Sequence, residues 1–249
     1  RGIVSSPVSA NAACLKCSPG QYSDVTPSLE RPVIECKDCP SGTYLTSEGN
    51  QKISNCTNCP TGKYGPDQGS TSLTFCQDCP MKTYLDEEGA IFSNQCKKCP
   101  AGRKGDKLGL ARPKDCTNCS KGHLAKFPGQ IVCTLATPGY FVPNVGMAIE
   151  IACPPGTHGV SDRISCRGCP AGFYQSLPAK TSCKPVGPGH FTNNSGNIAQ
   201  IACPPGNHGE NERTQCRKCP AGFFQTRQGR DSCSLVAPGH YTSAVGSVA

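Results

Sequence analysis

The chain has 249 residues, of which 21 are Cys, 28 Gly and 23 Pro, with no Trp and two Met. This composition excludes a conventional globular core and is typical of a disulfide scaffold made in an oxidising compartment. The net charge is +8, but basic and acidic residues alternate without a run of five like charges, which argues against nucleic acid as a partner. No apolar run is long enough to span a membrane. We therefore expect an extracellular or cell-surface protein.

The repeats divide the chain into three parts. Residues 1–13 are small and polar, and they predict a linker or the end of an upstream module. Residues 14–119 carry cysteine-rich modules with a period of about 20 residues. Residues 120–249 carry modules of 16–17 residues that form a 50-residue super-repeat, and segments 153–191 and 203–241 resemble a recent duplication.

The repeated unit is a C-x-x-C-P-x-G-x-Y box, which occurs thirteen times, whole or degenerate. Gly stands three residues after the second cysteine in twelve copies, where Lys82 is the exception, and an aromatic residue stands two positions later in nine. In that ring position, Lys104 and Leu124 are further departures. Pro fixes the backbone φ, Gly permits a tight turn, and the ring is placed to cover a neighbouring disulfide. We expect short two-stranded hairpins and almost no helix.

Two modules reveal which cysteines pair. Ala136, Val186 and Val236 replace the second cysteine of their boxes, and the boxes that follow Ala136 and Val186 also lack their first cysteine, where Glu150 and Gln200 stand. Both ends of one loop were therefore lost together, which favours a bond from the second cysteine of each box to the first of the next. A crossed pairing, first to third and second to fourth, is the competing scheme, and it would join Cys133 to Cys153.

The sequential rule uses twenty of the 21 cysteines and leaves Cys14 unpaired in this window, with a partner expected upstream of residue 1. Each bridge would stabilise its loop by about 3 kcal/mol in the chain-entropy model. The predicted pairs are Cys17–Cys36, Cys39–Cys56, Cys59–Cys76, Cys79–Cys96, Cys99–Cys116, Cys119–Cys133, Cys153–Cys166, Cys169–Cys183, Cys203–Cys216 and Cys219–Cys233.

The motif at 36–44, 56–64 and 166–174 resembles the ephrin-receptor-like and tumour-necrosis-factor-receptor-like cysteine-rich repeats. The series with a 20-residue period is also similar to cysteine-rich surface antigens of ciliates. The resemblance implies extracellular, elongated, disulfide-bonded arrays that act as stalks, coats or ligand-binding ectodomains. The expected fold is a rod of tandem cystine-stapled β-hairpin loops, since each module contacts mainly its sequence neighbours.

Other chemistry is weaker in this sequence. The spacing from Cys36 to Cys59 fits a four-cysteine zinc ribbon, but solitary cysteines along the second half would leave such sets incomplete, so we expect no metal and no other cofactor. His158 and His208 stand in the ring position, and His190 and His240 just before a ring; we read them as ring-sized fillers rather than a metal ladder. No catalytic constellation is present, which predicts a protein that is not an enzyme.

Three N-x-S/T triplets are candidate glycosylation sites. Asn193 is the best of them, because cysteine occupies the middle position of the triplets at Asn55 and Asn118. The sequence thus predicts a glycoprotein.

The first functional hypothesis is a structural repeat region of a long extracellular or cell-surface glycoprotein, whose partners are copies of itself or neighbouring repeats. The alternative is a receptor ectodomain that binds a protein ligand or glycans, with Phe127 and Tyr140–Phe141 as anchors. A third hypothesis is fibril self-assembly through the apolar stretches 145–149 and 198–201.

Overall fold

The computed structural model describes residues 16–24 and 35–248, so the predicted linker 1–13 and Cys14 lie outside the described residues. The described chain divides into two compact units. The first lies within Arg1–Pro100 and Gly105–Thr117, and the second within Ala101–Lys104 and Asn118–Ala249. The division by repeat length at residue 119 stays a prediction.

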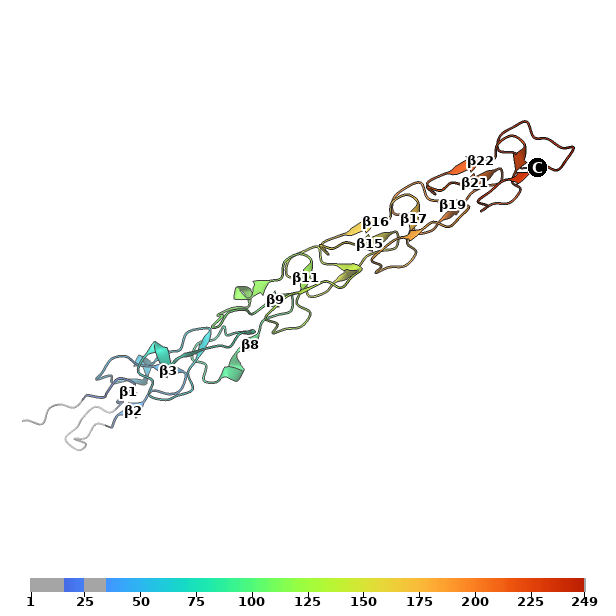
Figure 1. Cartoon of the computed structure of the whole chain (residues 1–249). Helices are drawn as coiled ribbons and strands as arrows, with labels where there is room; N and C mark the ends of the chain where they lie inside the picture. The colour runs from blue at the N-terminus through green and yellow to red at the C-terminus, as the bar shows by residue number, and fades with distance from the viewer. Residues whose placement is uncertain (1–15, 25–34, 249) are drawn as a thin grey trace, which may run out of the picture. The chain divides into compact units, whose positions relative to one another are not determined.

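The first unit is built from hairpins of two-residue strands (Figure 1). In each hairpin, the residues after the box turn pair antiparallel with the two residues between the cysteines of the next box, as Tyr44 pairs with Thr57. The strand pairs are β1 (Gln21–Tyr22) with β2 (Lys37–Asp38), β3 (Thr43–Tyr44) with β4 (Thr57–Asn58), β5 (Lys63–Tyr64) with β6 (Gln77–Asp78), and β7 (Thr83–Tyr84) with β8 (Lys97–Lys98). Two further strands, β9 (Arg103–Lys104) and β10 (Thr117–Asn118), lie where the units meet in sequence.

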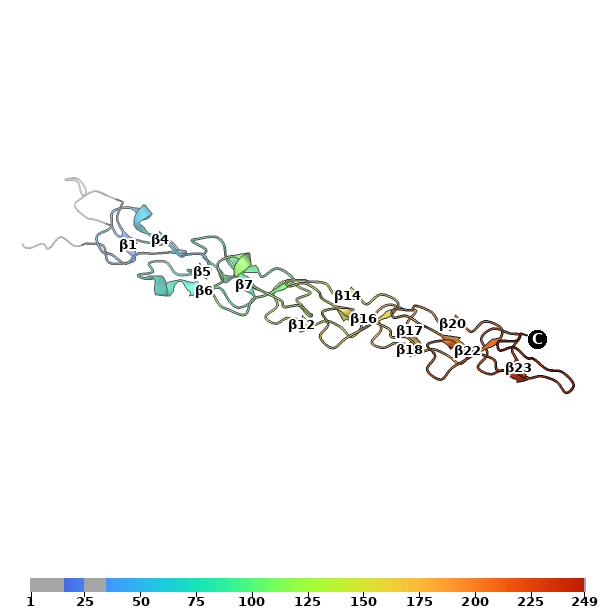
Figure 2. The same ribbon diagram turned by 90° about the horizontal axis from the view of Figure 1, so that it is seen from above.

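The second unit repeats the same hairpin, and Figures 1 and 2 show its hairpins following one another in chain order. Two of its hairpins have three-residue strands. Its strand pairs are β11 (His123–Leu124) with β12 (Thr134–Leu135), β13 (Tyr140–Phe141) with β14 (Ile151–Ala152), β15 (Thr157–Gly159) with β16 (Cys166–Gly168), β17 (Phe173–Tyr174) with β18 (Lys184–Pro185), β19 (His190–Phe191) with β20 (Ile201–Ala202), β21 (Asn207–Gly209) with β22 (Cys216–Lys218), and β23 (Phe223–Phe224) with β24 (Ser234–Leu235).

Helix is limited to single 3₁₀ turns in the described residues, which confirms the expected fold class of small disulfide-stapled hairpins. These turns precede the first cysteine of a box: η1 (Ile53–Asn55), η2 (Leu73–Phe75), η3 (Ser93–Gln95) and η4 (Pro113–Asp115). Among residues 16–24 and 35–248, no helix has the length and apolar character needed to cross a membrane.

The box glycine is required by close packing between modules. Gly42 has φ +85°, its N–H donates to the Gly65 carbonyl at 2.7 Å, and its own carbonyl accepts from the Cys59 N–H at 2.8 Å. A Cβ on Gly42 would lie 2.3 Å from the carbonyl oxygen of Gly89, which belongs to the next module but one. Lys82 keeps the same turn with φ +80°, a conformation that costs a residue with a Cβ about 1–2 kcal/mol. The module that contains Gly42 therefore packs against its next two neighbours.

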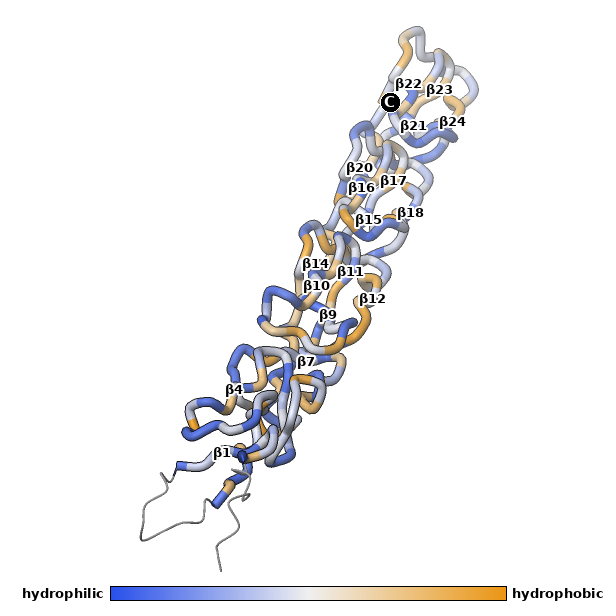
Figure 3. The backbone as a smooth tube through the Cα atoms, turned by 90° about the vertical axis from the view of Figure 1, so that its left-hand side faces the viewer, coloured by the Kyte–Doolittle hydropathy of each residue, from blue (hydrophilic) through white to orange (hydrophobic). Residues whose placement is uncertain are grey.

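The buried residues form small separate clusters rather than one core, and Figure 3 shows hydrophobic residues in short stretches along the chain. The ring of Tyr64 packs against a cluster that contains the next disulfide, Cys79–Cys96, together with Leu85. Tyr84 packs in the same way against the cluster that contains Cys99 and Cys116. These contacts confirm the expectation that the box ring covers a neighbouring disulfide.

Candidate functional site

The candidate functional feature of this chain is the series of contacts that close the loop of each module. Most of these contacts are disulfides. The structure joins the same ten cysteine pairs that the sequential rule gives, with sequence separations of 13 to 19 and Cα–Cα distances of 5.6 to 6.0 Å. The second cysteine of each box is buried, as at Cys39, Cys59 and Cys153. Because these sulfurs bond one another, they are not available as the thiolate ligands of a zinc ribbon.

In the part of the chain that the structure describes, the two complete modules 136–150 and 186–200 lack a disulfide but keep the backbone arrangement of the others. Ala136 and Val186 are buried at the place of the missing cysteine. The Ala136 N–H donates to the Gly122 carbonyl at 2.9 Å, and the Val186 N–H donates to the Gly172 carbonyl at 3.0 Å. Cysteines of the stapled modules make the equivalent bond, as the Cys59 N–H does to Gly42. Loss of the sulfur has therefore not displaced the chain.

A side-chain hydrogen bond joins the loop ends in these two modules. Glu150 stands where the first cysteine of the next box is missing, and its carboxylate accepts from the Thr137 N–H at 2.6 Å and from the Thr137 hydroxyl at 2.8 Å. At the corresponding place, the amide oxygen of Gln200 accepts from the Gly187 N–H at 2.8 Å. We call these two contacts the polar clasps. They connect the same two ends that a disulfide connects elsewhere.

An arginine from the following module adds a second contact to each clasp module. The Arg163 guanidinium donates to the Ala136 carbonyl at 2.8 Å, and the Arg213 guanidinium donates to the Val186 carbonyl. In a stapled module the equivalent carbonyl accepts from a backbone N–H, as Cys119 does from Gly146 at 2.8 Å. The arginine side chains thus satisfy carbonyls that would otherwise be left without this bond.

A small apolar cluster lies under the first clasp. It consists of Leu124, Ala136 and Val142, with Met147 packed against it. Leu124 takes the ring position of its box, so a branched aliphatic side chain covers Ala136 where a ring covers a disulfide elsewhere. The module without a disulfide is held by noncovalent contacts alone.

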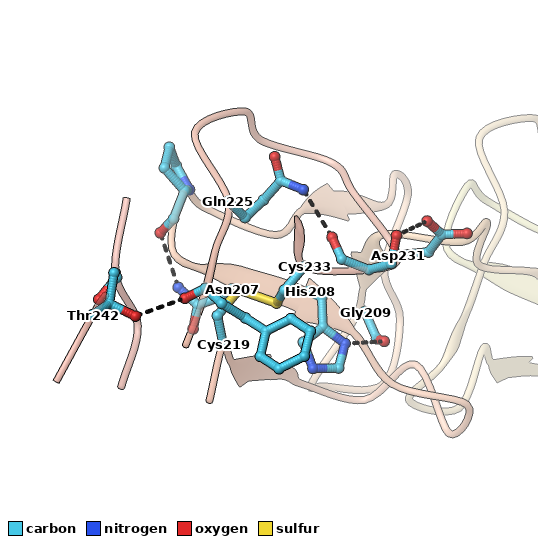
Figure 4. Close-up of a disulfide and its surroundings, with 12 residues drawn as sticks. Asn207, His208, Gly209, Cys219, Gln225, Asp231, Cys233 and Thr242 are labelled. Carbon is cyan, nitrogen blue, oxygen red and sulfur yellow. Dashed lines mark hydrogen bonds between the residues drawn. A yellow bond between two sulfur atoms is a disulfide. The ribbon is translucent and has the colours of Figure 1, made fainter. Parts of the chain in front are cut away.

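The duplicated half repeats its polar contacts as well as its sequence. The Gln175 amide donates to the Ser182 carbonyl at 2.8 Å, and at the matching place in the second copy the Gln225 amide donates to the Ser232 carbonyl at 2.7 Å (Figure 4). Both glutamines are buried. The repeat of buried contacts indicates that one packing rule serves both copies.

The histidines lie in local structural roles. In His158 and His208, the ring Nδ1 lies 3.1 Å from the carbonyl oxygen of the next residue. Figure 4 shows the His208 ring with its contact to the Gly209 carbonyl, in the same module end as the Cys219–Cys233 disulfide. His190 Nδ1 lies 2.9 Å from the Pro188 carbonyl oxygen. Within the described ranges, His, Cys, Asp and Glu side chains form no group of three or more that could hold a metal ion.

An open depression of about 500 Å³ lies on the hairpin of β15 and β16. Arg167 pairs across the strands with His158, and Asp162 and Ser165 also line the depression. The lining carries both a carboxylate and a guanidinium, so it does not favour a ligand of one charge.

Exposed ion pairs lie on the surface of the first unit. Lys97 lies 2.8 Å from both Asp86 and Glu87. The hydrogen bond from Lys97 lowers the pKa of Asp86, and the bonds to the two carboxylates raise the pKa of Lys97. Exposed pairs of this kind contribute little to stability.

The candidate glycosylation sites lie on the surface. Asn193 is in an exposed loop of a clasp module, whereas Asn55 lies in η1 and Asn118 in β10, each directly before a disulfide-bonded cysteine. Only Asn193 has an acceptor triplet without a cysteine.

One comparison with known proteins agrees with this arrangement. Residues 29–76 and 206–249 match the family model described as tyrosine-protein kinase ephrin type A/B receptor-like. The search of curated proteins gave no match. The two matched segments, together with ten regularly spaced disulfides in tandem modules, fit a cysteine-rich repeat family.

Proposed function

Because this chain is a cysteine-rich repeat protein with ephrin-receptor-like modules, we propose that it is a non-enzymatic spacer: the structural repeat region of a long extracellular or cell-surface glycoprotein. In this role it is a stalk, coat or fibre that holds other parts of the molecule at a distance. The ten disulfides and the family match both fit an extracellular or cell-surface location.

The observation that carries the proposal is the recurrence of one set of contacts between successive modules. The N–H of the box turn donates to a carbonyl in the next module at Gly42 to Gly65, and again one module later at Gly62 to Leu85. Repeats that contact only their near neighbours through one rule add up to an extended array. A spacer of this kind gains length by copying a module, which the 50-residue duplication fits.

The test is to insert a further copy of residues 153–202 after residue 202 and to measure the maximum dimension by small-angle X-ray scattering. The spacer account predicts a fixed increase in length with each inserted copy. A matched control inserts a linker of Gly and Ser with the same number of residues, which forms a flexible coil and gives a smaller, broadly distributed increase. A compact particle whose dimension barely changes with the inserted copies would contradict the proposal.

The fibre form of the proposal requires exposed apolar side chains that another copy can cover. Ile149 is 69% exposed and Ile198 is 58% exposed, and both lie in the clasp modules. If copies associate through these stretches, an Ile149→Lys, Ile198→Lys variant sediments as a monomer at concentrations where the wild type associates. Equal association of the wild type and the variant would refute the fibre form of the proposal, and the stalk form would stand.

A receptor ectodomain is the second candidate, and exposure of Phe127 favours it. The Phe127 ring is 63% exposed with the Lys126 ammonium 5.9 Å from its centroid, whereas Tyr140 and Phe141 are half-buried in β13. Tagged wild-type and Phe127→Ser proteins can be compared for binding to cell surfaces. Binding that the substitution abolishes supports a receptor, and binding that is absent or unchanged supports a spacer.

A further inference from the structure

We propose that the two clasp modules, 136–150 and 186–200, are the extensible elements of the chain: under tension they open and lengthen, while the disulfide-closed modules stay locked. This proposal rests on the proposed function, because a spacer is loaded through its ends. It assigns the missing disulfides a mechanical role.

The argument begins with the covalent path that carries force through a closed module. Tension that reaches Cys153 passes through the sulfur–sulfur bond to Cys166, so the residues between them bear no load. The path then continues through Arg167 and Gly168 to Cys169, where the next bridge begins. Unfolding such a module releases only the short connector between two bridges.

No covalent bypass exists across a clasp module. The bridge that begins at Cys119 ends at Cys133, and the next begins at Cys153, so the whole segment from Cys133 to Cys153 carries the load. The same holds for the segment from Cys183 to Cys203, which has the same length. A fully extended chain spans at most about 3.5 Å per residue, so each of these two clasp segments has a contour of roughly 70 Å.

The contacts that resist opening are noncovalent. In the first clasp module they are the bonds of Glu150 with Thr137, the bond from Arg163 to the Ala136 carbonyl, and the cluster around Leu124. In the second, Gln200 and Arg213 make the corresponding bonds. All of these contacts reform when the load is removed, so the extension is reversible, whereas a disulfide would have to be reduced.

The experiment stretches the oxidised full chain between its termini in a single-molecule force instrument. Besides extension of the tail after Cys233, we expect two unfolding events, each consistent with the contour of one clasp segment, and refolding when the force is relaxed. Ala136→Cys, Glu150→Cys introduces a bridge across the first clasp and should remove one event, and Val186→Cys, Gln200→Cys should remove the other. Ala136→Ser, Glu150→Ser is the matched control: it cannot form a bridge and keeps both events.

Formation of each new bridge is checked by mass spectrometry and thiol titration before stretching, so that a variant without its bridge is not scored. An unchanged number of events in a bridged variant would overturn the proposal, as would wild-type events much longer than one clasp segment. The scattering experiment separates this inference from the spacer itself. If the length grows with copy number but the two unfolding events are absent, the spacer proposal stands and the extensible elements are refuted. If the two events occur in a compact particle, the extensible elements stand and the spacer proposal is refuted.

Discussion

The carboxylate of Glu150 accepts hydrogen bonds from both the backbone N–H and the hydroxyl of Thr137, at 2.6 and 2.8 Å, between loop ends that a disulfide joins in the neighbouring modules. Gln200 and Gly187 make the corresponding bond in the second clasp module. A side-chain hydrogen bond therefore replaces the disulfide at both places where a cysteine pair is missing within the described chain. At these places a noncovalent polar contact, rather than a covalent bridge, holds the loop ends together.

Removing the first clasp should loosen its module alone. Glu150→Ala leaves the exposed Thr137 N–H to water, and we expect a local loss of about 0.5–1.5 kcal/mol, the net contribution of a typical hydrogen bond. Hydrogen exchange should accelerate for amides of 136–150 and stay unchanged in the disulfide-closed modules. Glu48→Ala is the control, since Glu48 makes an exposed ion pair with Lys16, which contributes little to stability. Equal effects of the two substitutions would refute the clasp.

Among its preferred aromatic sites, chymotrypsin should cut the oxidised chain into separable pieces only at residues outside the disulfide loops. In the described chain, these are Tyr140, Phe141, Phe191 and Tyr241, because every other tyrosine and phenylalanine lies inside a disulfide loop. Cleavage inside a loop leaves its two fragments joined by the bridge. On a non-reducing gel the first cuts should therefore release fragments that end near residues 141 and 191.

The same digestion discriminates between the two disulfide schemes. In the crossed scheme a Cys133–Cys153 bridge would span the cut at Tyr140, and the fragments would separate only after reduction. Release without reductant agrees with sequential pairing.

Two substitutions in the box turn are expected to change the stability of the protein in opposite directions. Gly42→Ala places a Cβ 2.3 Å from the Gly89 carbonyl oxygen at φ +85°, so we expect a destabilisation of about 1–3 kcal/mol. Lys82→Gly relieves a side chain held at φ +80° and should stabilise the protein by up to about 1 kcal/mol. Chemical denaturation under oxidising conditions measures both. A neutral Gly42→Ala would show that modules do not pack on their next-but-one neighbours.

Glycan is expected at Asn193 when the protein is secreted from eukaryotic cells. The residue is exposed, and its acceptor triplet contains no disulfide-bonded cysteine. Enzymatic removal of N-glycans should shift the mass of the peptide that contains residues 193–195, and Asn193→Gln should abolish that shift. Modification at Asn55 or Asn118 but not at Asn193 would reverse the ranking.

The sequence predicts most of the scaffold, because paired cysteines disappear in pairs. The joint loss at Ala136 and Glu150 points to the sequential scheme, and the box itself indicates a turn followed by a ring. The clasps do not follow from the same rule, since the cysteine pattern identifies Glu150 and Gln200 only as positions without a cysteine. A signal was present in the alignment of the modules: both replacements are residues with a side-chain oxygen, and Arg163 and Arg213 stand where most modules have Gly.

Packing between a module and its next neighbour but one could not be predicted from the repeat. The spacing of cysteines defines each loop, but the distance from Gly42 to Gly89 depends on how successive hairpins turn relative to one another. That rotation is set by the backbone hydrogen bonds between modules, and no residue pattern in the sequence identifies those bonds.

The most direct test of this account is disulfide mapping of the unreduced protein by mass spectrometry. Sequential pairing predicts ten bridges between consecutive boxes, with Cys119 bonded to Cys133 and Cys153 bonded to Cys166. Recovery of a peptide in which Cys133 is bonded to Cys153 would contradict the pairing, the clasp modules and the mechanical role that follows from them.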